Sequence, residues 1–393
     1  MIFANLANWP FLSLVEATPA MIAELHHAAG QLRENLRQAT TGLVEREQLA
    51  ELILLAAVAQ EHLLVIGPPG TAKSAVVRRV ARSLGGRYFE YLLGRFTEPS
   101  ELFGAVDLRK LRDGTVETDV SDMLPEADIA FLDEVFLGST AILNTLLGLL
   151  NERQFRRGHT RLHCPLRICV AAANALPEDE ALAAFADRFL VHSFVSPVAD
   201  HQLEALLAGG WQVAQQPPAA GNSLAQLDLL SAQVARVDMR EAMPALVNAI
   251  RSLRAAGIPL SDRRLVRSQR LIAAATVLAG RLQAQEADIW PLLCVIPTEA
   301  LQAQARDVLR EQIACSANAT LFSACEATVQ QPLSRAARLE SAAQECLARS
   351  ATVTPARLEA LLREIDANFS REQLPEALAG LRTQLAARLV VTA

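Results

Sequence analysis

The 393-residue chain contains no long hydrophobic run. Its longest apolar segments, Leu52–Ala59 and Leu63–Ile66, are short and are flanked by Glu51 and Glu61. A helix that crosses a bilayer needs about 20 apolar residues, so the sequence predicts no membrane span. The N-terminal segment Met1–Phe11 also lacks a cationic region. We therefore expect no secretory signal.

The sequence also lacks an excess of basic residues. It has 37 basic and 43 acidic residues, and the formal charge is −6. A protein that coats nucleic-acid phosphates normally carries a basic balance, so bulk binding to DNA or RNA is disfavoured. The six cysteines form no CxxC pair, which is typical of reduced cysteines in a cytoplasmic protein. Only 5% of the residues are aromatic, and the abundance of Ala and Leu favours a helix-rich chain.

Strand-like segments alternate with helical patterns over residues 42–194. The predicted helices cover residues 20–40, Leu43–Gln60 and Ala72–Leu84, and the predicted strands cover His62–Ile66, Tyr88–Leu92, Ile129–Leu132 and Ile168–Ala172. This alternation predicts an α/β fold in which helices cover both faces of a parallel sheet. Asp107–Asp119, with its Asp-Gly pair, and the locally basic Phe155–Arg167 interrupt the pattern, and both resemble hairpins.

The second half of the chain has a different pattern. Gln215–Ser223 is rich in turn-forming residues and predicts a linker. Beyond it the sequence predicts amphipathic helices at Leu224–Val237, Arg240–Ala255 and Asp262–Gln285, and further helices over residues 300–393. We therefore expect an all-helical region to follow the α/β core.

The strongest chemical signal is a glycine-rich segment between a predicted strand and a predicted helix. It consists of Gly67, Pro68, Pro69, Gly70, Thr71, Ala72, Lys73 and Ser74. Such a loop can aim several backbone N–H groups at one phosphate, and the helix N-terminus adds partial positive charge. Lys73 would reach the terminal phosphates and Ser74 would bind Mg²⁺. Ala72 replaces the second glycine of the usual P-loop pattern, which costs little if its φ is negative.

A second segment supplies the acidic residues that a P-loop enzyme needs. Asp133 and Glu134 follow the apolar run Ile129–Leu132. Asp133 would hold Mg²⁺ directly or through water. Glu134 would polarise the attacking water as a general base. Two adjacent acids at this place favour nucleotide hydrolysis over simple binding.

Two further residues could complete the site. Asn174 ends the apolar run Ile168–Ala173, where its amide could reach the γ-phosphate or the water, although it could also simply satisfy a turn. Arg188 follows a predicted helix and could act on the γ-phosphate of a neighbouring subunit. Its alternatives are an ion pair with Asp187 or a place among ordinary surface charges.

Taken together, these motifs resemble those of AAA+ ATPases of the MoxR group. The segments Leu93–Gly104 and Ala141–Arg153 are similar to the RavA branch of that group. The resemblance implies a three-layer αβα ATPase core, a helical lid and assembly into a hexameric ring. We accordingly expect an N-terminal lead-in at 1–41, the core at 42–214, the lid at 224–298 and a helical C-terminal extension at 299–393.

The resemblance also implies details of the site and its partners. ATP and Mg²⁺ are the expected cofactors, and adenine would lie between the lid and Gly42, Leu43 and Val44. The lid would carry a sensor arginine, for which we favour Arg263 over Arg264. The insertion at 107–119 and the hairpin at 155–167 would face the ring pore or a partner. That partner would carry a von Willebrand factor A (vWA) domain.

Two other functions remain compatible with the sequence. One is a nucleotide-gated scaffold with negligible turnover, which the intact Asp133-Glu134 pair disfavours without excluding it. The other is a DNA-acting AAA+ motor, for which the basic hairpin at 155–167 is the only support.

Overall fold

A five-stranded, fully parallel sheet forms the centre of the computed structural model. The structure describes residues 18–198, 202–215, 221–329, 339–340, 343–344, 346–347, 358–359, 361–362, 365–366 and 375–392. The strand order is β2 (Tyr88–Leu92), β3 (Ile129–Asp133), β6 (Ile168–Ala173), β1 (Leu63–Ile66) and β7 (Val191–Phe194). The predicted parallel α/β fold is confirmed, and β7 is a strand that we did not predict.

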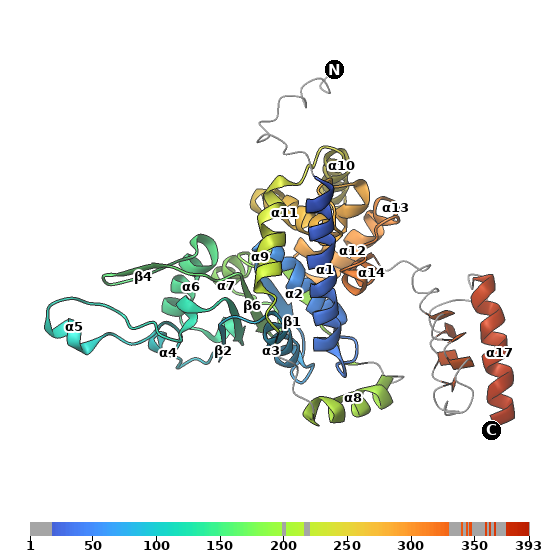
Figure 1. Ribbon diagram of the computed structural model, residues 1–393, viewed down its shortest axis with the longest axis horizontal. Coiled ribbons are helices and arrows are strands. Elements are labelled where there is room, and N and C mark those ends of the chain that lie inside the picture. The colour runs from blue at the N-terminus through green and yellow to red at the C-terminus, as the bar shows by residue number, and fades with distance from the viewer. Residues whose placement is uncertain are drawn as a thin grey trace, which may run out of the picture.

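Helices cover both faces of this sheet and make three layers (Figure 1). In β1, Leu63 and Val65 belong to one hydrophobic cluster, while Leu64 and Ile66 belong to the other, because side chains alternate along a strand. The first cluster includes α1 (Pro19–Thr40), α2 (Glu47–Ala59) and α3 (Lys73–Leu84), and the second includes α4 (Pro99–Phe103), α6 (Thr140–Glu152) and α7 (Glu180–Ala186).

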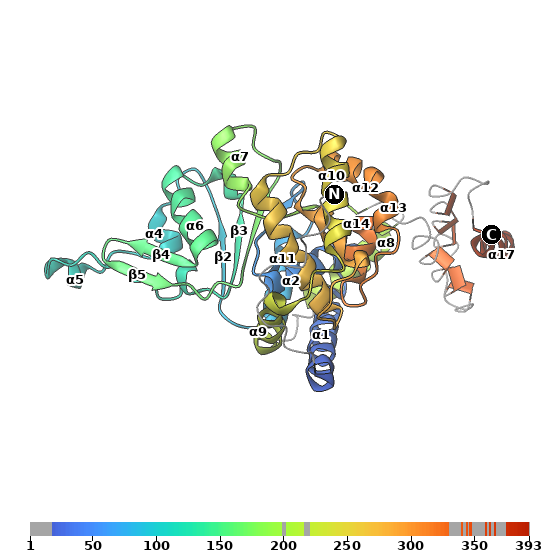
Figure 2. The same cartoon turned by 90° about the horizontal axis from the view of Figure 1, so that it is seen from above.

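Two segments project side by side from the edge of the core (Figures 1 and 2). One is the hairpin of β4 (Gln154–Arg157) and β5 (Thr160–His163), as predicted. In the other, Asp107 caps the short helix α5 (Leu108–Arg112). Its two arms pair in antiparallel fashion at Val106 and Thr118, where the N–H of Asp107 donates to the carbonyl oxygen of Glu117 (2.8 Å). The Val116 N–H donates to Nδ1 of His159 (3.1 Å), which joins the two projections.

The helical region packs against the α1–α2 side of the core. It comprises α9 (Leu224–Gln233), η5 (Val234–Arg236), α10 (Met243–Ala255), α11 (Asp262–Leu278), η6 (Glu286–Val295), α12 (Glu299–Val308), α13 (Arg310–Ile313) and α14 (Phe322–Val329). Its buried residues and those of α2 form one continuous hydrophobic cluster that extends to Val329. The predicted boundary at 298/299 falls inside this cluster, so we propose that the lid extends to Val329.

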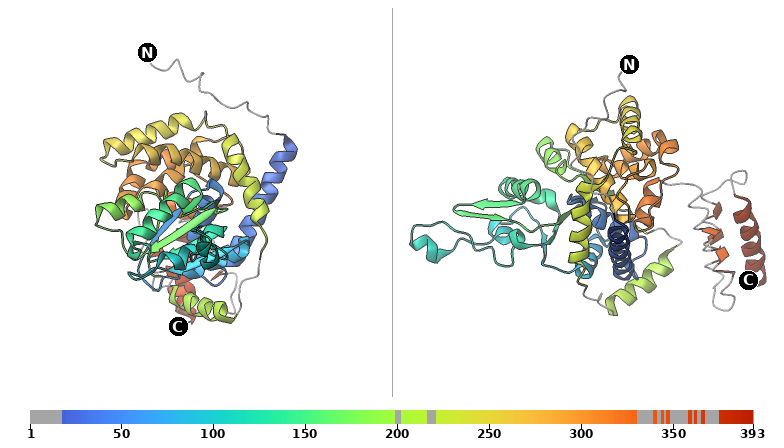
Figure 3. Two further views of the ribbon diagram at one scale, coloured as in Figure 1. Left: turned by 90° about the vertical axis from the view of Figure 1, so that its left-hand side faces the viewer. Right: turned by 45° about the horizontal axis from the view of Figure 1, so that its top comes forward.

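Two helices lie outside this arrangement. Helix α8 (Leu203–Gln215) lies at the surface (Figure 3), where a Cβ on Gly209 would be 2.4 Å from the carbonyl oxygen of Gly42. Helix α17 (Glu376–Thr392) belongs to a separate hydrophobic cluster that includes Leu358 and Leu385. Residues 216–220 of the predicted linker lie outside the described residues. No helix in the described part of the chain is long and apolar enough to cross a membrane.

A buried carboxylate joins the helical region to the core. Glu51, on α2, accepts a hydrogen bond from the N–H of Ala324 in the first turn of α14 (2.7 Å). Burial raises the pKa of Glu51 to about 7, and hydrogen bonds from Ala324 and Ser323 partly oppose this shift. Burial therefore favours the protonated carboxyl near neutral pH, whereas the capping hydrogen bonds favour the ionised form.

This shift predicts a pH dependence of stability. The pKa of Glu51 rises from 4.5 to about 7 on folding, so the folded chain binds the proton more tightly than the unfolded chain. Its contribution is fully present below pH 4.5 and is lost as the pH rises through 7. Glu51→Gln keeps an acceptor oxygen and removes the charge. We expect the variant to gain stability over wild type as the pH rises from 5 to 8, by at most about 3 kcal/mol. Urea unfolding across this range measures the difference, and parallel curves would contradict the assignment.

The turn between β1 and α3 corrects one expectation. Ala72 has φ 62° and ψ 21°, in the left-handed region, whereas we expected a negative φ. A side chain in this region costs about 1–2 kcal/mol. The start of the turn is also tightly packed, because a Cβ on Gly67 would lie 2.2 Å from the Val195 carbonyl oxygen. The phosphate loop therefore holds a strained backbone at Ala72.

This strain predicts that Ala72→Gly stabilises the chain by about 1 kcal/mol, because glycine adopts a positive φ without steric cost. Chemical denaturation measures the change. Ala75→Gly, in the helical part of α3, is the matched control and should destabilise the chain by about 0.5–1 kcal/mol. A loss of stability in both variants would show that Ala72 is not strained.

Candidate active site

The carboxyl edge of the sheet gathers the predicted loop, acidic pair and amide. Parallel strands end at the same edge, which is where open α/β sheets place their sites. The N–H of Gly67 donates to the carbonyl oxygen of Ala173 (3.1 Å), so the loop begins beside the residue that precedes Asn174. Strand β6 pairs with β1 on one side and with β3, which ends at Asp133, on the other. Residues from three separate motifs therefore meet at one place.

Lys73 lies across the loop that precedes it. Its Nζ donates to the carbonyl oxygens of Gly67 (2.6 Å) and Pro68 (3.0 Å). Burial lowers the pKa of Lys73, and the charges of Asp133 and Glu134 partly restore it. The ammonium group therefore lies within electrostatic range of both carboxylates.

Asn174 and Glu134 are in direct contact. The Asn174 Nδ2 donates to Oε1 of Glu134 (2.5 Å). Glu134 has φ 51°, a left-handed conformation for a residue with a long side chain. Strained backbone of this kind clusters at functional sites, where the surrounding structure maintains it. The hydrogen bond from Asn174 orients the Glu134 carboxylate. Asn174 therefore does more than satisfy a turn.

Ser74 and Asp133 fit the donor set that Mg²⁺ prefers, a hydroxyl and a carboxylate oxygen. The Asp133 Oδ1 accepts the N–H of Glu134 (3.0 Å), which fixes the carboxylate at the strand end. No group of three or more His, Cys, Asp or Glu side chains in the described residues could hold a metal. A magnesium ion here would therefore take most of its ligands from phosphate and water.

The predicted arginines lie at the opposite edge of the sheet. Arg188 precedes β7, whose first residue, Val191, aligns with Leu63 at the start of β1. Its Nε is buried and has no hydrogen-bond partner among the residues that the structure describes. Arg263 donates to Oδ1 of Asn151 at the end of α6 (2.6 Å). The phosphate loop follows the other end of β1. Within one subunit, these arginines and the loop are therefore separated by the length of a strand.

Arg264 has a different environment from Arg263. Its side chain is 4% exposed and pairs with Asp187 (2.6 Å). It also donates to the carbonyl oxygens of Leu190 (3.1 Å) and Val295 (2.5 Å). Arg264 therefore ties α11 to the start of β7, and Asp187 pairs with it and not with Arg188.

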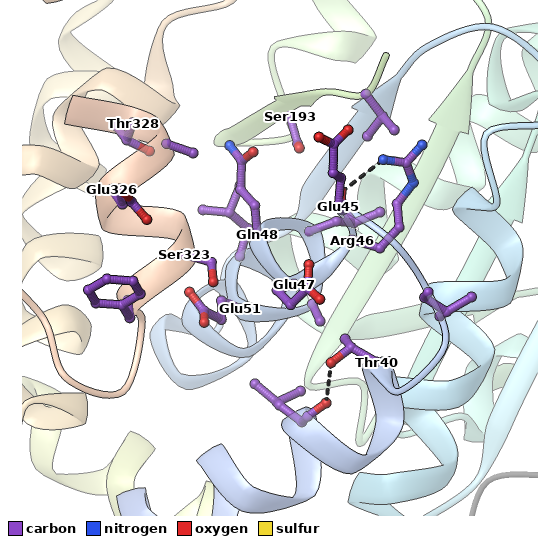
Figure 4. Close-up of a pocket in the computed structure, with 18 of the residues that line it drawn as sticks. Thr40, Glu45, Arg46, Glu47, Gln48, Glu51, Ser193, Ser323, Glu326 and Thr328 are labelled. Atoms are coloured by element: carbon purple, nitrogen blue, oxygen red, sulfur yellow. Dashed lines mark hydrogen bonds between the residues drawn. The ribbon is translucent and has the colours of Figure 1, made fainter. Parts of the chain in front are cut away.

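A cavity of about 1070 Å³ lies between the α1–α2 junction, β7, α12 and α14, and no residue of the phosphate loop lines it. Gly42, Leu43 and Val44, the predicted adenine segment, line part of it. Figure 4 shows Glu45, Arg46, Glu47 and Glu51 on one side, and Ser323, Glu326 and Thr328 on the other. Within the described chain, the predicted lid at 224–298 contributes Leu293 and Cys294 to this lining, whereas α12 and α14 contribute more.

Sequence reasoning missed one residue next to the loop. Arg46 is 5% exposed and donates to the carbonyl oxygen of Thr71 (2.8 Å). Nothing in its sequence context indicated this contact, because the two residues lie in different motifs and meet only in the folded chain.

Comparison with known proteins agrees with this geometry. Residues 30–233 match the family described as the MoxR domain in MoxR-vWA-beta-propeller ternary systems. An uncharacterized protein of Methanocaldococcus jannaschii is 34% identical over 269 residues, which cover 68% of this chain and 70% of that protein. Chaperone MoxR1 of Mycobacterium tuberculosis is 27% identical over 49% of this chain and 50% of its own length.

The fold also matches a solved structure. A crystal structure from Cytophaga hutchinsonii, assigned as an ATPase, superposes with a TM-score of 0.59 at 16% identity and covers 76% of this chain and 97% of that one. The family match covers about half of the chain and includes the loop, the acidic pair and Asn174. The chain therefore belongs to the MoxR family of AAA+ ATPases, in the group described as MoxR domains of MoxR-vWA-beta-propeller systems.

Proposed function

We propose that this protein hydrolyses ATP with Mg²⁺ and uses the energy to remodel or mature a partner protein. The observation that carries the proposal is the hydrogen bond between Asn174 and Glu134, placed beside the loop that holds Lys73. A simple nucleotide-binding scaffold has no need for an oriented carboxylate at this position. This contact therefore favours turnover over nucleotide-gated presentation.

Each residue has a role that follows from its place. The N–H groups of the loop and Lys73 would bind the β- and γ-phosphates. Ser74 and Asp133 would hold Mg²⁺, which neutralises charge that develops on the phosphates. Glu134 would polarise the attacking water while Asn174 fixes its carboxylate. Gly42, Leu43 and Val44 would contact adenine at the wall of the cavity.

We further propose that the complete site needs a second subunit. Arg188 and Arg263 lie at the edge of the sheet opposite the phosphate loop, so both would act on the γ-phosphate held by a neighbour. A guanidinium group stabilises the charge of the transition state. A closed homo-oligomeric ring presents every such edge to a neighbouring loop. The hexamer is the ring size that the AAA+ resemblance implies.

The partner is proposed from the family. Its description places MoxR domains in systems with vWA and β-propeller proteins, and MoxR1 of M. tuberculosis is named a chaperone. We propose a vWA-domain partner for this chain, in the cytoplasm, with contacts through α5 and the β4–β5 hairpin or along the pore. We also propose a place near the RavA branch for this chain, from the likeness of Leu93–Gly104 and Ala141–Arg153 to that branch.

Two substitutions separate binding from hydrolysis. Lys73→Ala should abolish detectable ATP binding, because the loop loses its only lysine. Glu134→Gln should bind ATP normally but hydrolyse it about a hundredfold or more slowly, because an amide cannot act as a base. Calorimetric binding and phosphate release measure the two effects. Glu152→Gln, an exposed change at the end of α6, is the control. Normal hydrolysis by Glu134→Gln would rule out the proposed base.

Mixed rings test the action of Arg188 on a neighbour. Arg188→Ala should bind ATP yet turn over about a thousandfold more slowly. Mixing it with Glu134→Gln subunits should restore part of the activity, because some sites then combine an intact Glu134 with an intact neighbouring Arg188. Phosphate release over a range of mixing ratios measures the recovery. Recovery at no ratio would mean that Arg188 does not act across subunits.

A further inference from the structure

Arg46 is a buried guanidinium that bonds to three main-chain segments. It lies immediately before α2 and is 5% exposed. Its Nε donates to the Thr71 carbonyl oxygen (2.8 Å), one terminal nitrogen donates to Ser196 (2.9 Å) and the other to Glu45 (2.8 Å). Figure 4 shows Arg46 at the side of the cavity that adjoins Glu45.

Burying this side chain is costly. Burial lowers the pKa of Arg46, and the nearby charges of Glu45 and Glu47 only partly oppose the shift. The described hydrogen bonds of Arg46 all go to carbonyl oxygens and none to a carboxylate. A planar guanidinium with several donors is suited to such a junction, because it can hold separate acceptors in one fixed geometry.

The bond to Thr71 controls the direction of the next N–H group. A trans peptide is planar, so the carbonyl of Thr71 and the N–H of Ala72 point in opposite directions. Arg46 bonds to the Thr71 carbonyl oxygen, so the N–H of Ala72 points away from Arg46. A phosphate bound in the loop would meet the N–H on that side.

This peptide is also the one under strain. Ala72 has φ 62°, and a flip of the Thr71–Ala72 peptide would bring that angle back to a negative value. The flip would break the bond to Arg46 and would turn the Ala72 N–H away from the inner side of the loop. The hydrogen bond from Arg46 therefore opposes the relaxation that the strain favours.

The bond to Ser196 steadies the same loop from its other end. Ser196 follows β7, and the preceding Val195 carbonyl oxygen would lie 2.2 Å from a Cβ on Gly67. Arg46 thus bonds to the loop at Thr71 and to the segment next to the residue that contacts Gly67.

We propose that Arg46 is a positioning residue for phosphate binding, which keeps the Ala72 N–H directed into the loop. This inference rests on the proposed binding of ATP. Because the N–H would contact phosphate both in the bound state and in the transition state, its loss should weaken binding more than it slows the bound-state chemistry.

The test measures Mg-ATP binding by calorimetry and hydrolysis by phosphate release, on the full chain. Arg46→Gln should raise the Kd for ATP at least tenfold and raise the KM similarly, with kcat changed less than threefold. Arg46→Lys, which keeps one charged donor, should be intermediate. The double variant Arg46→Gln with Ala72→Gly should regain part of the lost affinity, since glycine keeps the left-handed conformation without the steric cost.

Arg153→Gln is the matched control. Arg153 is half-buried and donates to the Gln60 carbonyl oxygen (2.9 Å), but it lies at the opposite edge of the sheet. Its substitution should lower the melting temperature and leave the Kd for ATP unchanged.

Three results would overturn the inference. An unchanged Kd in Arg46→Gln would show that the loop does not need Arg46. An equal rise in Kd for Arg153→Gln would show that the weaker ATP binding of Arg46→Gln comes from a general loss of stability. Failure of Ala72→Gly to recover any affinity would remove the link to the strained peptide. If wild type itself bound no ATP, the proposed function would fail, and the inference with it.

Discussion

The parallel pairing of β1 between β6 and β7 is the constraint on which the site depends. In this arrangement the chain leaves β1 at the same edge where β3 and β6 end, so the loop, Asp133, Glu134 and Asn174 converge. Strands β1 and β6 are buried on both faces, and the two hydrophobic clusters hold them in register. A slip of one residue would exchange the two faces of the strand and separate these groups.

The same pairing separates the two halves of the proposed chemistry. Glu134 and Lys73 lie at the carboxyl edge, whereas Arg188 and Arg263 lie near the amino edge. Four residues of β1 span about 13 Å, which no arginine side chain can cross within one subunit. Assembly is therefore a geometric condition of complete catalysis in the proposed mechanism, and a monomer would bind nucleotide without its charge-stabilising arginines.

Buried polar groups hold the helical region in a fixed place on the core. Arg264 connects α11 to the segment before β7, Glu51 caps α14, and Arg46 connects the start of α2 to the phosphate loop. Each of these groups loses hydration on folding and recovers it only through specific acceptors or donors. They therefore favour one docking geometry over others of similar hydrophobic burial.

Local patterns in the sequence determined the parallel α/β core, the hairpin at β4–β5 and the candidate residues of the loop and acidic pair. These features follow from spacing between near neighbours, where periodicity and motif chemistry act directly. The short strand β7, with His192 and Ser193 among its four residues, lacks such a pattern. The left-handed Ala72, the burial of Arg264 and the contact between Arg46 and Thr71 were decided only by the tertiary structure. Each depends on groups brought together from distant parts of the chain, and their energies exist only after the sheet and helices have packed.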